Sequence, residues 1–396
     1  MLDFNKVVQQ IDSISKESFI DTDAVQETMD NAQAALDRAM RAPADFAARL
    51  DENASWVLWP VATPLEDIGT KRTISVADDS YTVVAVDGSQ IMPSHHEVHT
   101  CYLLNVGMAL ITYGARLPPR LETEPKLYSR PEDLYPLVDR RRLHIDELYV
   151  SLERTILELE TLANAAVEAK DRGLPVLALY DGSLIPWSVE KLPDGYQHSY
   201  INRMSDALSR LEENQIPIVG YLSHSRGADL VNCLRVFICP YETSHCREHC
   251  GDLNEEDFPC SKVWPLSDRL LFKPHLNLNE RSATFLSGAS VSKLLPRQHR
   301  ICFTYMHVGE EITRLEFPRW LLTQEGQLLD ALSMILSQCQ KGMGYPVSLA
   351  ESHHLAVIKG TDRDQFFELI TRHLLTLGIN QIKTSPKQSK KRWGFV

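Results

Sequence analysis

The chain has 396 residues, of which 43% are hydrophobic and 24% charged, and its formal net charge is −12 at pH 7. This composition is typical of a globular protein with a large core, excludes a low-complexity chain, and at this length allows two or three domains. No apolar stretch approaches the roughly 18 residues of a membrane span, and the polar, acidic first thirty residues do not resemble a signal peptide, so we expect a cytoplasmic, soluble protein.

Residues 1–75 are predicted to form a helical arm without strands. Val25, Met29, Ala32, Leu36 and Met40 follow helical spacing. An arm of this kind packs on its own domain or on another subunit.

From Tyr81 onward the pattern changes to short apolar, β-branched runs, which are typical of buried strands. A strand over 81–88 and one or two more within 97–114 form a meander, and a proline-rich segment at 116–136 is predicted to be irregular. The following elements are a helix from about Arg141 to Asp171, a strand at 175–182, a helix near 200–213, a strand at 216–225, a hairpin made of 300–308 and 312–318, and C-terminal helices.

This β-β-β-α-β-α-β succession predicts a mixed sheet with helices packed on it, an α/β fold. We expect a helical N-terminal arm at 1–75, a main domain at 76–235 and 299–380, a Cys-rich insertion at 236–298, and a basic flexible tail at 381–396.

The tripeptide Asp-Gly-Ser closes two of the predicted strands, at Asp87 and at Asp181. One such motif is ordinary turn chemistry, since Gly permits a sharp turn and Ser bonds local backbone. Two on adjacent central strands would bring two carboxylates together, and a divalent cation relieves their repulsion. Oxygen ligands in an open site favour Mn²⁺ or Mg²⁺, and paired ions of this kind serve phosphodiester hydrolysis.

A third carboxylate is expected from the helix that precedes the second motif. Leu152, Leu159 and Leu162 lie on its predicted buried stripe, and Glu158 is about 90° from the centre of that stripe. Glu158 is our first choice as the third carboxylate, and Glu160 is the alternative. Either glutamate could instead be an ordinary solvated charge on the helix surface.

Taken together, the order of these segments resembles the NurA nucleases. The segments are the helical arm, "AVDGS", the meander, "RTILELE", "LYDGSL", "SHSRGADL" and "YPVSLAESHHLAVIKGTDRDQF". The match covers about 80–235 and 300–375. The resemblance implies an RNase H-like core, metal-dependent processing of single- and double-stranded DNA ends in double-strand break repair, a homodimer, and a HerA-type hexameric ATPase as partner.

Residue by residue, the resemblance implies that Asp87 and Asp181 are catalytic aspartates, with Glu158 or Glu160 as the helix glutamate. It aligns Tyr345 and His353 with an active-site tyrosine and histidine. Ser225 and Arg226 fall on its Ser-Arg-Gly segment, and Arg226 is a candidate DNA contact.

The chain departs from the family at one further position. An acidic residue of some relatives is Leu355 here. Either that carboxylate is dispensable or Glu351, on the same helical face, replaces it.

Cys239, Cys246, Cys250 and Cys260 lie in one short segment, with Cys233, His245 and His249 nearby. Their spacing is neither a zinc-ribbon pair nor a standard ferredoxin run. We predict a structural metal, zinc in preference to an iron–sulfur cluster; reduced thiols in a packed loop are the alternative.

Two basic sets could gather DNA despite the negative net charge. Arg140, Arg141 and Arg142 lie at the start of the predicted glutamate helix, and the tail contains Lys383, Lys387, Lys390, Lys391 and Arg392. The sequence thus favours a nuclease, and its rival is a non-catalytic adaptor of the same fold that docks on a motor ATPase. An adaptor has no reason to keep two clustered carboxylates.

Overall fold

A computed structural model describes residues 3–18, 22–78, 80–93, 100–324 and 326–378. The chain divides into two compact units. Unit 1 comprises Met1–Thr73, Leu222–Ser290 and Ile301–Leu315, and unit 2 comprises Ile74–Tyr221, Val291–Arg300 and Glu316–Val396. The domain boundaries predicted above stay a prediction beside this grouping, and the tail at 381–396 lies outside the described residues.

Unit 2 is built on a sheet in which the two Asp-Gly-Ser strands are neighbours. Its strand order is β9-β8-β3-β4-β5. Strands β3 and β4 and strands β4 and β5 are antiparallel, whereas β8 runs parallel to both β3 and β9. The strands are β3 (Thr82–Ile91), β4 (Tyr102–Thr112), β5 (Arg120–Tyr128), β8 (Val176–Asp181) and β9 (Ile218–Leu222). In chain order this is 3-2-1-4-5, an RNase H-like arrangement, and the predicted mixed α/β fold is confirmed.

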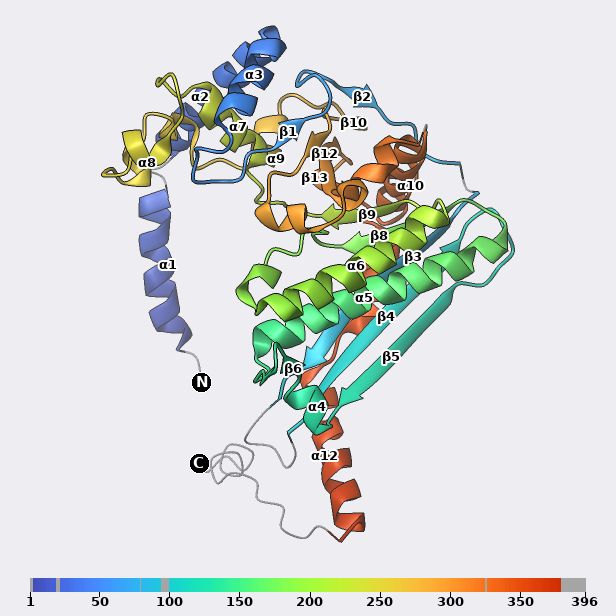
Figure 1. Cartoon of the computed structure of the whole chain (residues 1–396). Helices are drawn as coiled ribbons and strands as arrows, with labels where there is room; N and C mark the ends of the chain where they lie inside the picture. The colour runs from blue at the N-terminus through green and yellow to red at the C-terminus, as the bar shows by residue number, and fades with distance from the viewer. Residues whose placement is uncertain (1–2, 19–21, 79, 94–99, 325, 379–396) are drawn as a thin grey trace. The chain divides into compact units, whose positions relative to one another are not determined.

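Helices cover both faces of this sheet at its centre. Helices α5 (Glu147–Ala169) and α6 (Asp194–Glu213) lie side by side along the sheet (Figure 1). Helix α11 (Val347–Ala356) packs on β3 and β4. Cover on both sides explains why the β3 run from Thr82 to Val86 is wholly buried.

The proline-rich segment is not irregular, contrary to the prediction. It contains β5 and a short helix, α4 (Pro131–Leu134). β5 accommodates Pro125 because it is the last strand of the sheet, where one edge has no ladder to complete. Proline density was therefore a poor guide at a sheet edge.

The helix that carries Glu158 begins later than predicted. Strands β6 (Leu137–Val138) and β7 (Arg141–Arg142) form a hairpin first, and Asp139 and Arg140 occupy its tip with φ of 48° and 64°. Asp146 then caps α5 by accepting a 2.8 Å hydrogen bond from the Tyr149 amide. The three arginines thus lie in a hairpin and not at the helix start.

The C-terminal part of unit 2 is helical, as predicted. Besides α11 it contains α10 (Gln327–Lys341) and α12 (Gly360–Thr376). Short 3₁₀ segments of this unit are Lys170–Arg172, Val189–Lys191, Arg297–His299 and Arg319–Leu322; Ser290–Leu294 begins at the last residue of a unit 1 segment.

Unit 1 combines short strands with helices from the N-terminal and Cys-rich segments. Its helices are α1 (Phe4–Ser18), α2 (Thr22–Arg41), α3 (Pro43–Asn53), α7 (Asp229–Phe237), α8 (Cys246–His249) and α9 (Asp268–Phe272), with 3₁₀ segments Glu255–Asp257 and Ser261–Val263. Its strands are β1 (Thr63–Pro64), β2 (Arg72–Thr73), β10 (Glu280–Arg281), β11 (Phe285–Leu286) and β12 (Ile301–His307), and β13 (Ile312–Pro318) starts in this unit.

The prediction that 1–75 has no strands is wrong. β1 pairs with β11, and β2 pairs with β10. Both strands are two residues long and their partners lie more than two hundred positions away, so no local periodicity announces them.

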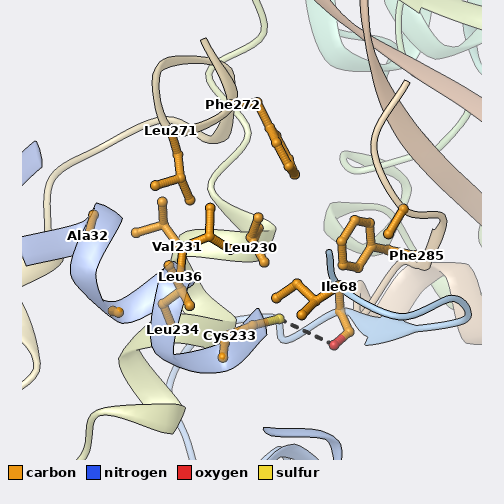
Figure 2. Packing of buried hydrophobic residues seen from close by; sticks show 14 of the residues in the cluster. Ala32, Leu36, Ile68, Leu230, Val231, Cys233, Leu234, Leu271, Phe272 and Phe285 are labelled. Atoms are coloured by element: carbon orange, nitrogen blue, oxygen red, sulfur yellow. Dashed lines mark hydrogen bonds between the residues drawn. The ribbon is translucent and has the colours of Figure 1, made fainter. Parts of the chain in front are cut away.

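Unit 1 has its own apolar core. Leu36 of α2 packs with Leu230, Val231 and Leu234 of α7, and the Cys233 thiol donates to the Ala62 carbonyl at 3.3 Å (Figure 2). Of the predicted stripe, Ala32 and Leu36 are therefore buried within unit 1, Met29 and Met40 are partly buried, and Val25 is exposed. Across the part of the chain that the structure describes, no helix has the length and apolarity needed to cross a membrane.

Candidate active site

Asp87 and Asp181 stand at equivalent positions of two adjacent parallel strands. Val86 of β3 pairs with Tyr180 of β8, so the next residue of each strand is an aspartate. Successive side chains of a strand alternate between faces, and both aspartates therefore point to the same face. Like charges this close raise the pKa of Asp181, after burial, which is the larger cause.

Glu158 approaches the same strand ends from the other face. Asp87 contacts α11 through His353, whereas a Cβ added to the next residue, Gly88, would lie 2.3 Å from Glu158 Oε1 on α5. Helices α5 and α11 thus pack on opposite faces at this point. Gly88 has no side chain, and this absence makes room for the glutamate.

The first Asp-Gly-Ser motif is not a turn, contrary to the prediction. β3 continues through it to Ile91. Only the second behaves as expected, since β8 ends at Asp181 and Gly182 has φ of 118°. The first glycine serves close approach of a helix, and the second serves a bend in the chain.

Glu158 is buried, with 4% of its surface exposed. The Tyr180 hydroxyl donates to its Oε2 at 3.0 Å, and Arg154 Nε lies 3.1 Å from its Oε1. Burial raises the pKa of Glu158 to about 7; the charge of Arg154 opposes this rise, and Asp87 and Asp181 add to it. The Oε1 atom is buried and has no hydrogen-bond partner.

The other glutamates of α5 are engaged elsewhere. Arg203 of α6 binds Glu160 through two hydrogen bonds of 2.7 and 2.9 Å and Glu153 through one of 2.9 Å. Both carboxylates therefore face α6. Glu158 is the candidate that we carry forward, because Asp87 and Asp181 contribute to its raised pKa, whereas Glu153 and Glu160 are bound by Arg203.

Residues from the C-terminal region complete the arrangement around the aspartates. The Tyr345 hydroxyl donates to Asp181 Oδ2 at 2.9 Å. His353 Nδ1 lies 2.7 Å from Asp87 Oδ2, while His354 beside it is exposed. The structure thus brings together Asp87, Asp181, Glu158, Tyr345 and His353, all in unit 2.

Ser183 makes the local contact expected of a turn serine, since its Oγ accepts from the Ile185 amide at 3.1 Å, but both motif serines also make long-range contacts. Ser89 Oγ donates to the carbonyl of Ala356, the last residue of α11, and Asn105 Nδ2 donates to the same oxygen at 2.8 Å. These bonds fix the end of the helix that carries His353. Ser183 Oγ donates to Glu316 Oε2 at 2.8 Å.

A divalent metal fits these residues by donor type but not by their present arrangement. All three carboxylates offer hard oxygen ligands, and one of their oxygens is buried without a hydrogen bond. However, no three His, Cys, Asp or Glu side chains within the described ranges are arranged to hold an ion as they stand. Asp87, Asp181 and Glu158 are instead turned to His353, Tyr345 and Tyr180.

A feature that the sequence reasoning missed lies beside Asp181. On the α5 face of the sheet, a pocket lined by Thr155, Tyr180, Ser183 and Tyr200 includes Trp187, a residue that is 48% exposed. Trp187 Nε1 donates to Ser183 Oγ at 3.2 Å. An aromatic residue six positions after Asp181 was the available signal.

The remaining candidates are not part of this group. Leu355 packs over Gly107 of β4, and Glu351 is half-buried on α11. Ser225 accepts from the Gly227 amide at 3.1 Å, and Arg226 is exposed, both in unit 1. The exposed set Arg140, Arg141 and Arg142 stays on its hairpin, where Arg142 donates to the Tyr135 carbonyl.

The four candidate cysteine ligands lie together in unit 1. Cys239, Cys246, Cys250 and Cys260 line one small pocket, whereas Cys233 faces the apolar core of Figure 2. None of the eight cysteines forms a disulfide.

A family model and several solved structures are similar to this chain. The model of the NurA domain family matches residues 81–358. The NurA nuclease from Sulfolobus solfataricus is a similar solved structure, at 15% identity and a TM-score of 0.46 over 77% of this chain and 88% of that one. The catalytic domain of human Endonuclease V is similar at 10% identity and a TM-score of 0.32, over 76% and 92%. None of the curated proteins matches the sequence.

The family match spans most of the chain and includes every residue gathered at the ends of β3 and β8. The chain belongs to the NurA family.

Proposed function

We propose that the chain is a divalent-metal-dependent deoxyribonuclease that processes DNA ends. The observation that carries this proposal is the pairing of Asp87 and Asp181 in register on parallel strands, with Glu158 reaching Gly88 from the opposite face. Mn²⁺ or Mg²⁺ would be held by these three carboxylates; when bound, such an ion activates water and neutralises charge on the scissile phosphate.

The side chains around the carboxylates have separate positioning tasks. Tyr345 orients Asp181 by donating to one of its oxygens. Arg154 partly offsets the charge of Glu158, which lowers the cost of ionising a buried carboxyl. Both contacts keep the carboxylates near the strand ends before substrate arrives.

His353 is the candidate proton donor. Its Nδ1 is bonded to Asp87, and this bond leaves the opposite ring nitrogen, Nε2, available. The side chain is 58% exposed, so a phosphate could reach it. A histidine in this position can protonate the leaving oxygen of the cleaved strand.

Trp187 supports a nucleic-acid substrate. Its half-exposed side chain donates to Ser183, two residues along the chain from Asp181, so a nucleobase stacked on it would place the adjoining phosphate near the end of β8. Stacking is tolerant of base identity, which suits an enzyme that acts on ends without a sequence motif.

We further propose that the enzyme is a homodimer and works with a HerA-type hexameric ATPase in double-strand break repair in the cytoplasm. Family membership supports this proposal. A net charge of −12 also supports it, because a partner that feeds DNA to the site would compensate for weak binding by the nuclease alone.

The test is incubation of the purified protein with end-labelled single- and double-stranded DNA. We expect cleavage with Mn²⁺, none with EDTA, and none from D87A or D181A. Activity that survives in either variant would refute the assignment. A protein that binds a HerA-type ring but cleaves nothing in any metal would instead be the adaptor.

A further inference from the structure

The loop that carries the four cysteines is held in place by the N-terminal helices. Arg49 of α3 donates to the carbonyl of Cys239, at 3.2 Å, and to those of Tyr241 and Glu242. Asn53 accepts from the Ser244 amide at 2.5 Å. The Cys246 amide donates to the Trp56 carbonyl at 3.2 Å. The ligand backbone is thus fixed by α3 and the residues just after it.

The four cysteines share one small pocket. Cys239, Cys246, Cys250 and Cys260 all line the same small pocket, and the last three are buried. Burial raises the pKa of Cys246, Cys250 and Cys260, and the neighbouring thiols add to this rise. Yet no three of them are close enough, among the described residues, to hold a single metal ion.

Arg235 of α7 faces this pocket with unused hydrogen-bonding capacity. It is 1% exposed, its guanidinium lies 3.5 Å from the Trp59 ring centroid, and its Nη1 binds Glu255 at 3.0 Å. Its Nε and Nη2 are buried without a partner within hydrogen-bond distance among the described residues, and its interaction with the Cys260 thiol, through hydrogen bonding and charge, opposes the rise in the pKa of that thiol that burial causes. Glu255 pairs with only one nitrogen of this buried cation, so a second negative group beside Nε and Nη2 would complete its hydrogen bonding.

Nearby histidines are already engaged. His249 stacks on Tyr241 with ring centroids 4.2 Å apart, and His245 Nδ1 accepts from the Glu248 amide. Phe258 and Trp59 complete an apolar wall. The pocket is thus lined by four cysteines, two histidines and apolar side chains, with one buried cation beside them, and we take the four sulfurs as the ligand set.

We propose that Cys239, Cys246, Cys250 and Cys260 bind an iron–sulfur cluster. A cluster of several iron and sulfide ions is larger than one zinc ion, so its four thiolates stand farther apart and around a space. Four-cysteine ligation is the common mode for such clusters. Their thiolates give the centre a net negative charge, which Arg235 partners. This reverses the preference for zinc that the spacing alone suggested.

The test is metal and sulfide analysis of the full-length protein purified without oxygen or chelator. We expect stoichiometric iron and acid-labile sulfide, visible charge-transfer absorption, and an electron paramagnetic resonance signal in one redox state. C246S and C260S should lose all three, whereas C233A, a change in the adjoining core, should keep them. The wild-type analysis does not depend on the folding of any variant.

Zinc without iron, or neither metal, in the wild-type protein would overturn the proposal, and so would full iron content in C246S and C260S. Nuclease activity is not the readout, so failure here is distinct from failure of the proposed function.

The reduction potential of the cluster tests the role of Arg235, because a residue with a purely structural role would not change it. R235M should lower the reduction potential of the cluster, because the lost positive charge stabilised its more negative, reduced form. K262M, which removes an exposed charge of the same segment, should change the potential less. Equal potentials in R235M and the wild type would overturn the assignment of Arg235.

Discussion

Replacing Glu158 by glutamine should stabilise the protein at high pH while abolishing its activity. The pKa of this carboxyl is raised from 4.5 to about 7, chiefly by burial. Ionisation therefore opposes folding once the pH exceeds 4.5, and this cost grows up to about pH 7 and is constant above it. A rise of about 2.5 units corresponds to about 3 kcal/mol at 1.36 kcal/mol per unit.

E158Q cannot ionise at this position and escapes that cost. Its free energy of unfolding relative to wild type, measured by urea denaturation in EDTA, should rise between pH 5 and pH 8 by roughly 2–3 kcal/mol. E160Q is the matched control, since it makes the same change two residues away and loses ion pairs to Arg203. It should show no such gain.

Adding Mn²⁺ provides the second half of this experiment. The ion should stabilise the wild type at pH 8, because it binds only the folded state, and should stabilise E158Q far less. A difference between E158Q and wild type that does not change with pH would refute the reasoning about the buried carboxyl.

Three further changes test neighbouring parts of the site. W187A should raise the Kd for single-stranded DNA by about 5- to 150-fold, because it loses a stacking energy of about 1–3 kcal/mol, and W187F should restore most of the affinity. Equal binding by the wild type, W187A and W187F would exclude the stacking role. H353A should lower kcat about 100-fold or more with little effect on KM, whereas H354A, at the adjacent exposed position, should keep activity. Equal losses of kcat in the two variants would argue against proton donation by His353. G88A should lose activity, because its Cβ would displace the buried carboxylate of Glu158, whereas G360A, where the added Cβ meets nothing, should behave as wild type. An active G88A would show that Glu158 is not needed in its present position.

The sheet and its two aspartates could be predicted because their signal is local. β3 and β8 each begin with a short run of buried, mostly apolar residues, and Asp-Gly-Ser follows that run in both cases. Glu158 could be ranked above Glu160 from its angle on the helix alone. What the sequence does not reveal is that Arg203, on the next helix, holds Glu160.

Other features depend on contacts that are distant in sequence. β5 contains a proline and is exposed along almost its whole length, so it is a strand only because β4 pairs with it. Ser89 looked like a turn residue, and its actual partner lies 267 positions away. One error was avoidable, since Asp146 is a strong helix N-cap and would have placed the three arginines outside α5.

The most direct test of the account is Mn²⁺ binding to the metal-free protein, measured from the electron paramagnetic resonance signal of the unbound ion. We predict that the wild type and E160Q bind the ion, and that D87N, D181N and E158Q, with folds intact by circular dichroism, bind it at least tenfold more weakly. Undiminished binding by D87N and D181N would contradict the claim that these carboxylates form the metal site.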